Sequence, residues 1–166
     1  MEPSDDELIR AIQSGRPEAF EALYLRHRDW VLALAWRFCR NREDSLDVLQ
    51  ETFAYLVEKL PGLELRARLR TFLYPAVKHL ALSRKSGRKT VPLEAAADVP
   101  APAAEPVELG ARLGSLPEAQ REVVLLRFAE GFDLGEIAEA LGIPVGTVKS
   151  RLHHALKALR ARGKPG

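Results

Sequence analysis

The pattern between residues 132 and 160 constrains the fold of this 166-residue chain more than any other feature. The apolar residues of a first short helix recur at i, i+3, i+4 and i+7: Leu134, Ile137, Ala138 and Leu141. Gly142 is expected to end that helix, because glycine adopts a left-handed backbone at little steric cost. Pro144 suits the start of a second helix. The apolar stripe of that helix is Val145, Val148, Leu152, Leu156 and Leu159.

The opposite face of the second helix is polar and basic. It carries Thr147, Lys149, Ser150, Arg151, His153, His154 and Lys157. From Thr147 to the end of the chain there are six Lys or Arg and no acidic residue. This arrangement is typical of a helix-turn-helix whose second helix lies in the DNA major groove. The alternative is an ordinary helical hairpin with a solvated basic face, which would not require so one-sided a charge.

Charge is distributed unevenly along the rest of the chain. The first 64 residues hold thirteen Asp or Glu and eight Lys or Arg, whereas residues 65–93 hold eight basic residues and no acidic one. Two basic regions suggest two contacts with a polyanion, with acidic surface left for another partner. The single cysteine, Cys39, cannot form an internal disulfide, which favours a reduced, cytoplasmic setting. The longest apolar run, residues 30–36, is too short to span a bilayer, so no membrane insertion is expected.

Three helices are predicted in the acidic amino-terminal part. Ser4 and Glu7 form a capping box before a helix that continues through Ile12. A long helix should follow, from Pro17 to about Asn41. A third helix, over residues 43–60, is expected to bury Leu46, Leu49, Phe53, Leu56, Val57 and Leu60.

The other side of the third helix is acidic. It carries Asp44, Asp47, Glu51 and Glu58, with Gln50 at its edge. Like charges three and four residues apart weaken a helix slightly, so this face suggests a basic partner surface. A solvated acidic face is the simpler interpretation. A carboxylate metal site would need Glu-x-x-His pairs from facing helices, and the sequence has none.

An arginine-rich loop over residues 61–70 leads into a fourth helix. An aromatic ring, hydrogen-bonding side chains and nearby cations suit unstacked single-stranded bases. The candidate contacts are Arg66, Arg68, Arg70, Phe72, His79, Ser83 and Arg84. Phe72 is equally compatible with a core position. Pro75 is expected only in a first turn, which allows the helix to begin as late as Tyr74.

Residues 86–107 contain four prolines and many alanines, which predict a flexible linker. The linker divides the chain into a first domain over residues 1–85 and a second domain over residues 108–166. The second domain is expected to open with a short helix at residues 108–113. Another helix should follow from Glu118, and its Val123, Val124, Leu125 and Leu126 supply core for the helix-turn-helix.

Three segments, in this order, resemble the bacterial extracytoplasmic-function sigma factors. They are DVLQETF at residues 47–53, RTFLYPAVKHLAL at residues 70–82, and residues 116–160 with the helix-turn-helix. The resemblance implies an all-α fold of two small helical domains, sigma region 2 and sigma region 4, joined by the flexible linker. It further implies a protein that directs core RNA polymerase to promoter DNA, has no catalytic residues or cofactor of its own, and is held by an anti-sigma factor.

The resemblance also assigns roles to residues. It implies that Asp44, Asp47, Gln50 and Glu51 bind core RNA polymerase, at the clamp helices of its largest subunit. The arginine loop and the fourth helix would capture and melt the −10 promoter element, and the helix with Lys149 would bind the −35 element as duplex. The chain departs from the family at several positions. Family members often have Asn and Asp at the positions of His79 and Ser83. A basic residue is usual at the position of Pro75, and arginine is frequent at the positions of His154 and Leu156. The loop also lacks the usual glycine-acid-aromatic sequence.

Two other classes of protein are alternatives to a sigma factor. A free-standing helix-turn-helix regulator would use only the second domain and would bind duplex DNA at half-sites without polymerase. An enzyme acting on nucleic acid would need a metal cluster or a phosphate-binding loop. The four histidines do not form ligand spacings with Cys39 or the carboxylates, and no glycine-rich phosphate loop is present. The sequence therefore predicts no metal and no enzyme activity.

Overall fold

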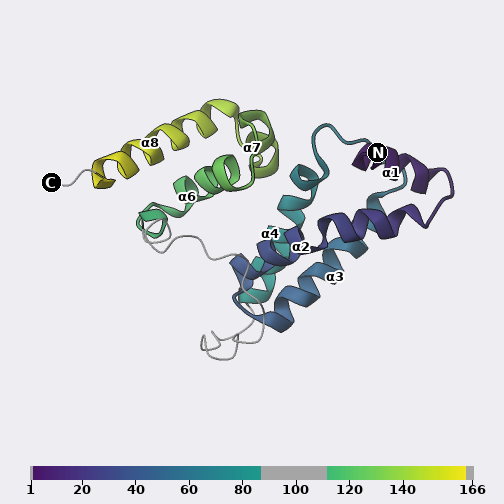
Figure 1. The fold of residues 1–166 in the computed structure, drawn as a ribbon. Helices are drawn as coiled ribbons and strands as arrows, with labels where there is room; N and C mark the ends of the chain where they lie inside the picture. Colours follow the sequence, from purple (N-terminus) through teal and green to yellow (C-terminus); the bar gives the residue numbers. More distant parts are fainter. Residues whose placement is uncertain (1, 87–111, 164–166) are drawn as a thin grey trace. The chain divides into compact units, whose positions relative to one another are not determined.

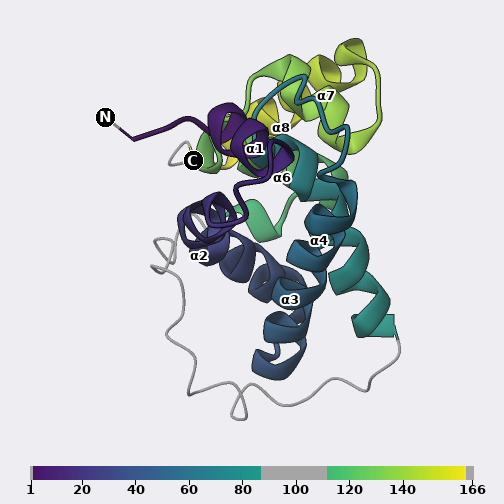
Figure 2. The ribbon, with the colours of Figure 1, turned by 90° about the vertical axis from the view of Figure 1, so that its right-hand side faces the viewer.

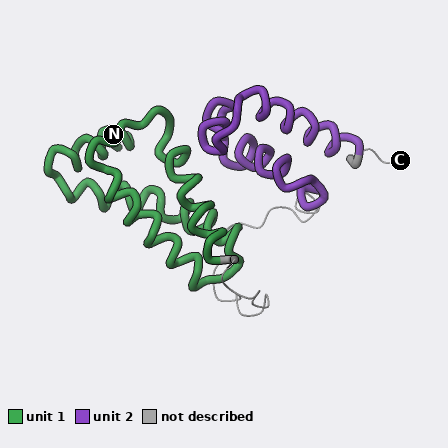
Figure 3. Tube along the Cα trace, turned by 180° about the vertical axis from the view of Figure 1, so that it is seen from behind, with its two compact units in different colours: residues 1–102 green, residues 103–166 purple. Residues whose placement is uncertain are grey.

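The computed structural model of the chain describes residues 2–86 and 112–163. The described residues form helices and no strand, so the predicted all-α class is confirmed (Figure 1). The chain divides into two compact units, Met1–Pro102 and Ala103–Gly166 (Figure 3). The predicted linker beyond residue 86 and most of the predicted helix at 108–113 lie outside the described residues.

The first unit consists of helices α1 (Asp5–Gln13), α2 (Ala19–Cys39), α3 (Arg42–Lys59) and α4 (Leu69–Ser86). The predicted capping box opens α1. The Ser4 hydroxyl accepts from the backbone N–H of Glu7, and the Glu7 carboxylate accepts from the backbone N–H of Ser4. Helices α2, α3 and α4 pack against one another, and α1 packs on α2 (Figure 2). The unit is therefore a three-helix core with a short helix added at its amino-terminal end.

The core of the first unit lies between α2, α3 and α4. Its fully buried members include Leu23, Val31, Leu34, Val48, Leu56, Leu69, Leu73 and Val77. Phe53 of α3 holds two aromatic rings of α2 edge-on, with ring centroids 6.2 Å from Phe20 and 4.8 Å from Tyr24. Each such pair adds about 0.5–1.5 kcal/mol beyond the area that it buries. These contacts fix how α3 is rotated about its axis, and so which of its residues face outward.

The predicted buried stripe of α3 is partly wrong. Leu46 and Val57 are exposed, with 39% and 51% of their surface accessible, whereas Val48 and Thr52 are completely buried. Ser45 and Thr52 can be buried because each hydroxyl donates to the carbonyl four residues earlier, over 2.7 Å in both cases. A pattern that counts only apolar residues overlooks such internally satisfied hydroxyls.

The predicted late start of α4 is also wrong. The helix begins at Leu69, so the exposed Pro75 lies inside it and has no N–H to donate along the helix. A proline there costs about 3 kcal/mol. Full burial of Leu69, Leu73 and Val77 contributes roughly 1.5–3 kcal/mol for each side chain, which is enough to keep the first turns helical.

The second unit consists of α6 (Glu118–Val124), a π-helical turn (Leu125–Ala129), α7 (Leu134–Leu141) and α8 (Val145–Gly163). Helix α8 packs on α6 and α7. Phe132, Ile137 and Val148 are completely buried where the helix-turn-helix closes. A second cluster contains Leu113, Leu116, Val124 and Ala155, with Leu125, Leu152, Ala158 and Leu159 packed against it. The predicted stripe of α8 is right for Val148 and wrong for Val145, which is 39% exposed because it lies in the first turn.

Candidate functional site

The helix-turn-helix of the second unit has the turn at Gly142 that its sequence predicts, together with a capping box that was not predicted. Asp133 caps α7 and forms a capping box with Glu136, whose backbone N–H lies 2.8 Å from the Asp133 carboxylate. Gly142 ends the helix at φ +66°, in the left-handed region. The N–H of Ile143 then donates to the carbonyl of Ala138 over 3.1 Å, which closes the turn before α8. The turn thereby sets the direction in which α8 leaves.

The predicted duplex-binding face of α8 lies opposite the buried Val148. Lys149, Ser150, His153 and His154 are exposed, whereas Thr147 and Arg151 are half-buried. The rings of His153 and His154 meet edge-to-face, with centroids 5.6 Å apart. All six predicted residues therefore lie on one helix, and four of them are accessible to a partner.

The candidate residues of the first unit are arranged differently, because α3 and α4 pair their charges. Arg84 of α4 donates from Nη1 to Asp47 Oδ2 over 3.3 Å and from Nη2 to Glu51 Oε1. The hydrogen bond with Glu51 raises the pKa of Arg84, and the charges of Glu51 and Asp47 raise it further against the opposing effect of desolvation. Residues predicted for two different partners thus form one cluster, which we call the Arg84 bridge: Asp47, Glu51 and Arg84.

The acidic face of α3 is smaller than predicted. Asp44 is only 4% exposed, so its predicted placement on the outer face is wrong. It lies in the first turn of α3, where its backbone N–H donates to the side chain of the N-cap residue Asn41 over 2.9 Å. Gln50 is exposed, and the side chains of Asp47 and Glu51 are about half exposed. Leu46, which the sequence placed in the core, joins this outer face as its apolar member.

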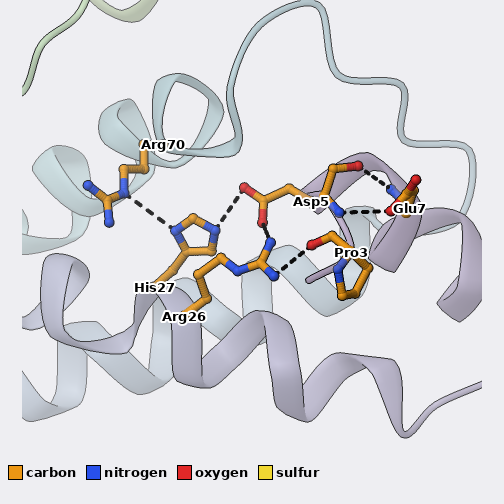
Figure 4. A network of polar contacts seen from close by, with 7 residues as sticks. Pro3, Asp5, Glu7, Arg26, His27 and Arg70 are labelled. Carbon is orange, nitrogen blue, oxygen red and sulfur yellow. Dashed lines mark hydrogen bonds and ion pairs between the residues drawn. The ribbon is translucent and has the colours of Figure 1, made fainter. Parts of the chain in front are cut away.

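Arg70 is held by a network that the sequence did not predict (Figure 4). His27 is buried, and its Nε2 lies 2.9 Å from Oδ2 of Asp5, while Arg70 Nε donates to His27 Nδ1 over 3.5 Å. Asp5 also pairs with Arg26, at 2.8 Å. The Arg70 guanidinium lies 5.2 Å from the ring centroid of Trp30. Side chains of three helices, α1, α2 and α4, therefore form the network that holds this candidate DNA contact.

The electrostatics of this network favour the ionised form of Asp5. Burial by itself raises the pKa of that carboxyl. The hydrogen bond and charge of His27, together with those of Arg26, outweigh burial and hold the pKa of Asp5 below its ordinary value. The link runs from the first turn of α1 to α2, across more than twenty residues of sequence, and no local pattern could have revealed it.

The other predicted contacts of the first unit divide into exposed and covered residues. Arg66 and Arg68 are exposed on the loop before α4, and His79 and Ser83 are exposed on α4. The Ser83 hydroxyl donates to the His79 carbonyl over 2.8 Å. Phe72 is half-buried, and one face of its ring stacks on Tyr55 of α3 at 5.9 Å with an interplanar angle of 19°. Its aromatic surface is thus partly covered, as a core position would require.

In the part of the chain that the structure describes, no group of three or more His, Cys, Asp or Glu could hold a metal ion. Among the same residues, no helix is both long and apolar enough to cross a membrane.

Comparison with known proteins matches each of the two units to a different region of the same class of protein. Residues 23–90 match the profile described as Sigma-70 region 2, and residues 107–159 match that described as Sigma-70, region 4. The ECF RNA polymerase sigma factor SigM of Mycobacterium tuberculosis (strain ATCC 25618 / H37Rv) is 31% identical over 160 residues, which cover 93% of this chain and 82% of that protein. The two profile matches and the similarity to SigM together define a sigma factor of the sigma-70 type.

Solved structures agree with this class. CnrH, in complex with the cytosolic domain of CnrY, is 26% identical with a TM-score of 0.68, over 93% of each chain. The sigma factor RpoE of Bartonella quintana, in complex with the anti-sigma factor NepR, has the same fold, with a TM-score of 0.62 at 21% identity over 86% of this chain and 94% of that chain. The chain belongs to the extracytoplasmic-function (ECF) RNA polymerase sigma factors. It is accordingly a helix-turn-helix DNA-binding protein of transcription initiation, a class that acts without enzyme activity of its own.

Proposed function

We propose that the first unit binds core RNA polymerase through the outer face of α3. The proposed contacts are Leu46, Asp47, Gln50 and Glu51, which are accessible and combine one apolar side chain with acidic and amide groups. Asp44 is left out of this contact surface because it is buried. Its charge contributes to the potential that holds Arg84.

Promoter recognition is divided between the two units in this proposal. The loop residues Arg66 and Arg68, with His79 and Ser83 of α4, contact the melted −10 element, where cations hold phosphates and polar groups read unstacked bases. The exposed face of α8 contacts the −35 element as duplex, in the major groove. Promoter opening then draws on the energy of binding single-stranded bases, and polymerase carries out the chemistry.

One observation carries the proposal: the exposed acidic face of α3 and the exposed basic face of α8 belong to two separate compact units. A regulator that only binds duplex DNA has no use for the first face. An acidic surface repels DNA and attracts a basic protein surface, so the two faces fit two different partners.

Run-off transcription tests this function directly. Purified chain is added to bacterial core RNA polymerase on a genomic template library, and transcripts are compared with those from core enzyme alone. We expect a small set of new start sites that depend on the chain. Tight duplex binding without polymerase, together with no new start sites, would instead identify a free-standing regulator.

Two further parts of the function concern its setting. RpoE, which has the same fold, is bound to the anti-sigma factor NepR, and this supports an anti-sigma factor as partner of this chain. Membership in a family that acts on RNA polymerase supports a cytoplasmic location. A bacterial two-hybrid assay between this chain and a candidate anti-sigma factor tests the first, and fractionation of the tagged protein tests the second.

A further inference from the structure

Arg84 is shared between the two proposed interfaces of the first unit. It belongs to α4, the proposed promoter-melting helix, yet both of its terminal nitrogens are used by Asp47 and Glu51 of α3, the proposed docking helix. The two carboxylates occupy one N–H of each terminal nitrogen, and a DNA phosphate brought to the same guanidinium would be repelled by their like charge. The bridge therefore raises the question of what happens to Arg84 when polymerase binds.

The charge balance of the bridge indicates an answer. Asp47 and Glu51 carry two negative charges and Arg84 carries one positive charge, so the bridge presents a single net negative charge in the free protein. A basic polymerase surface that docks on α3 provides new cations for the same carboxylates. The pull of the carboxylates on Arg84 then weakens, because their charge is shared with another partner.

The bridge is also exposed enough to exchange partners. The side chains of Arg84, Asp47 and Glu51 are 26%, 48% and 43% exposed, and ion pairs at such exposure are weakly held. Among the described residues, the Nε of Arg84 is buried without a hydrogen-bond partner, so the bridge does not satisfy the whole guanidinium. A phosphate accepts from the guanidinium fork as well as a carboxylate does.

We propose that Arg84 couples the two interfaces of this chain: it neutralises α3 in the free protein and passes to a promoter phosphate when polymerase takes over Asp47 and Glu51. The inference rests on the proposed docking role of α3. Because coupling between two binding sites is reciprocal, promoter DNA must raise the affinity for polymerase by the same factor that polymerase raises the affinity for DNA.

The test uses the full chain with the variant Arg84→Gln, which removes the charge and keeps a polar side chain. Affinity for core polymerase should rise about fivefold, since the internal competitor for α3 is gone. Affinity of the resulting holoenzyme for promoter DNA should fall, and its salt dependence should lose about one unit of slope. Arg28→Gln is the matched control, because Arg28 is an exposed arginine that pairs with its neighbour Asp29. We expect no change of either affinity for it.

Two other variants separate the possible failures. Arg84→Lys keeps the charge but cannot bridge two carboxylates with a planar fork, so it should raise polymerase affinity by less and leave the salt slope unchanged. If circular dichroism shows that Arg84→Gln does not fold, Arg84→Lys takes its place in the polymerase-binding test. Asp47→Lys with Glu51→Lys should abolish most polymerase binding.

The outcomes distinguish the inference from the function on which it rests. If Arg84→Gln lowers polymerase affinity or leaves it unchanged, while the double lysine variant binds polymerase poorly, Arg84 is no competitor and the coupling is wrong although α3 still docks. An unchanged salt slope for Arg84→Gln also overturns the coupling. If the double lysine variant binds polymerase like the wild type, then α3 is not the docking face, and both proposals fall.

Discussion

The two candidate DNA-binding surfaces are built in opposite ways. In the second unit, the recognition face comes from α8 alone, and Lys149 and His153 extend from it into solvent. In the first unit, Arg70 and Arg84 both come from α4, but they are held by side chains of α2 and α3. In the second unit, the basic side chains therefore present their own charge directly to a partner. In the first unit, side chains of neighbouring helices modify the charge that Arg70 and Arg84 present.

The largest effect is expected on the single-helix surface. Replacing Lys149 and Arg151 by alanine should lower affinity for the −35 duplex at least tenfold and reduce the salt slope by about one unit for each lost phosphate contact. The free energy of unfolding should change by less than about 1 kcal/mol, because Lys149 is exposed, Arg151 is only half-buried and alanine favours a helix. Filter binding or fluorescence anisotropy across salt concentrations, on a promoter from the run-off assay, measures both quantities.

The control for this variant is Arg10→Ala, which removes an exposed arginine from α1. It should leave affinity and slope unchanged. If the double alanine variant also keeps its slope, then Lys149 and Arg151 do not touch phosphates, and the exposed face of α8 is merely solvated. The contrast between the two units would then disappear.

A smaller effect is expected where tertiary contacts hold the first unit. Asp5→Asn removes an ionised partner of His27 and Arg26, and should lower the free energy of unfolding at neutral pH by about 1 kcal/mol. The pKa of Asp5 in the folded protein lies below its ordinary value of 3.8, so its contribution is present above that value. The contribution is lost as the pH falls through the folded pKa. Urea titrations at neutral pH and below pH 4 should therefore show a difference that shrinks in acid.

Asp6→Asn is the matched control for this comparison, since Asp6 is an exposed carboxylate in the same first turn of α1. It shares the favourable interaction with the helix dipole but lies outside the described network. If both variants lose the same stability, the dipole explains the effect and the network with His27 adds nothing.

The same contrast explains how much could be predicted from the sequence. The capping box at Ser4, the turn at Gly142 and the basic face of α8 follow from spacings within one or two helical turns, and the structure has all of them. Burial of Ser45 and Thr52, the helical Pro75 and the Arg84 bridge depend on which helices pack together. Local periodicity contains no information about such partners, so these features were missed or misplaced.

The smallest effect on the fold is expected at His79, which tests whether α4 acts directly on DNA. His79 is exposed, and in contrast to Arg70 and Arg84 it is the backbone carbonyl of His79, not its ring, that accepts from a neighbouring side chain, Ser83. His79→Ala should therefore change the free energy of unfolding by less than about 0.5 kcal/mol. It should reduce promoter opening severalfold while the closed complex forms normally, because the side chain is proposed to act only on unstacked bases. Permanganate reactivity of thymines in the −10 element measures opening. Equal reactivity in wild type and variant would show that this face of α4 does not contact the melted bases. The arginine loop would then be the main DNA contact of the first unit.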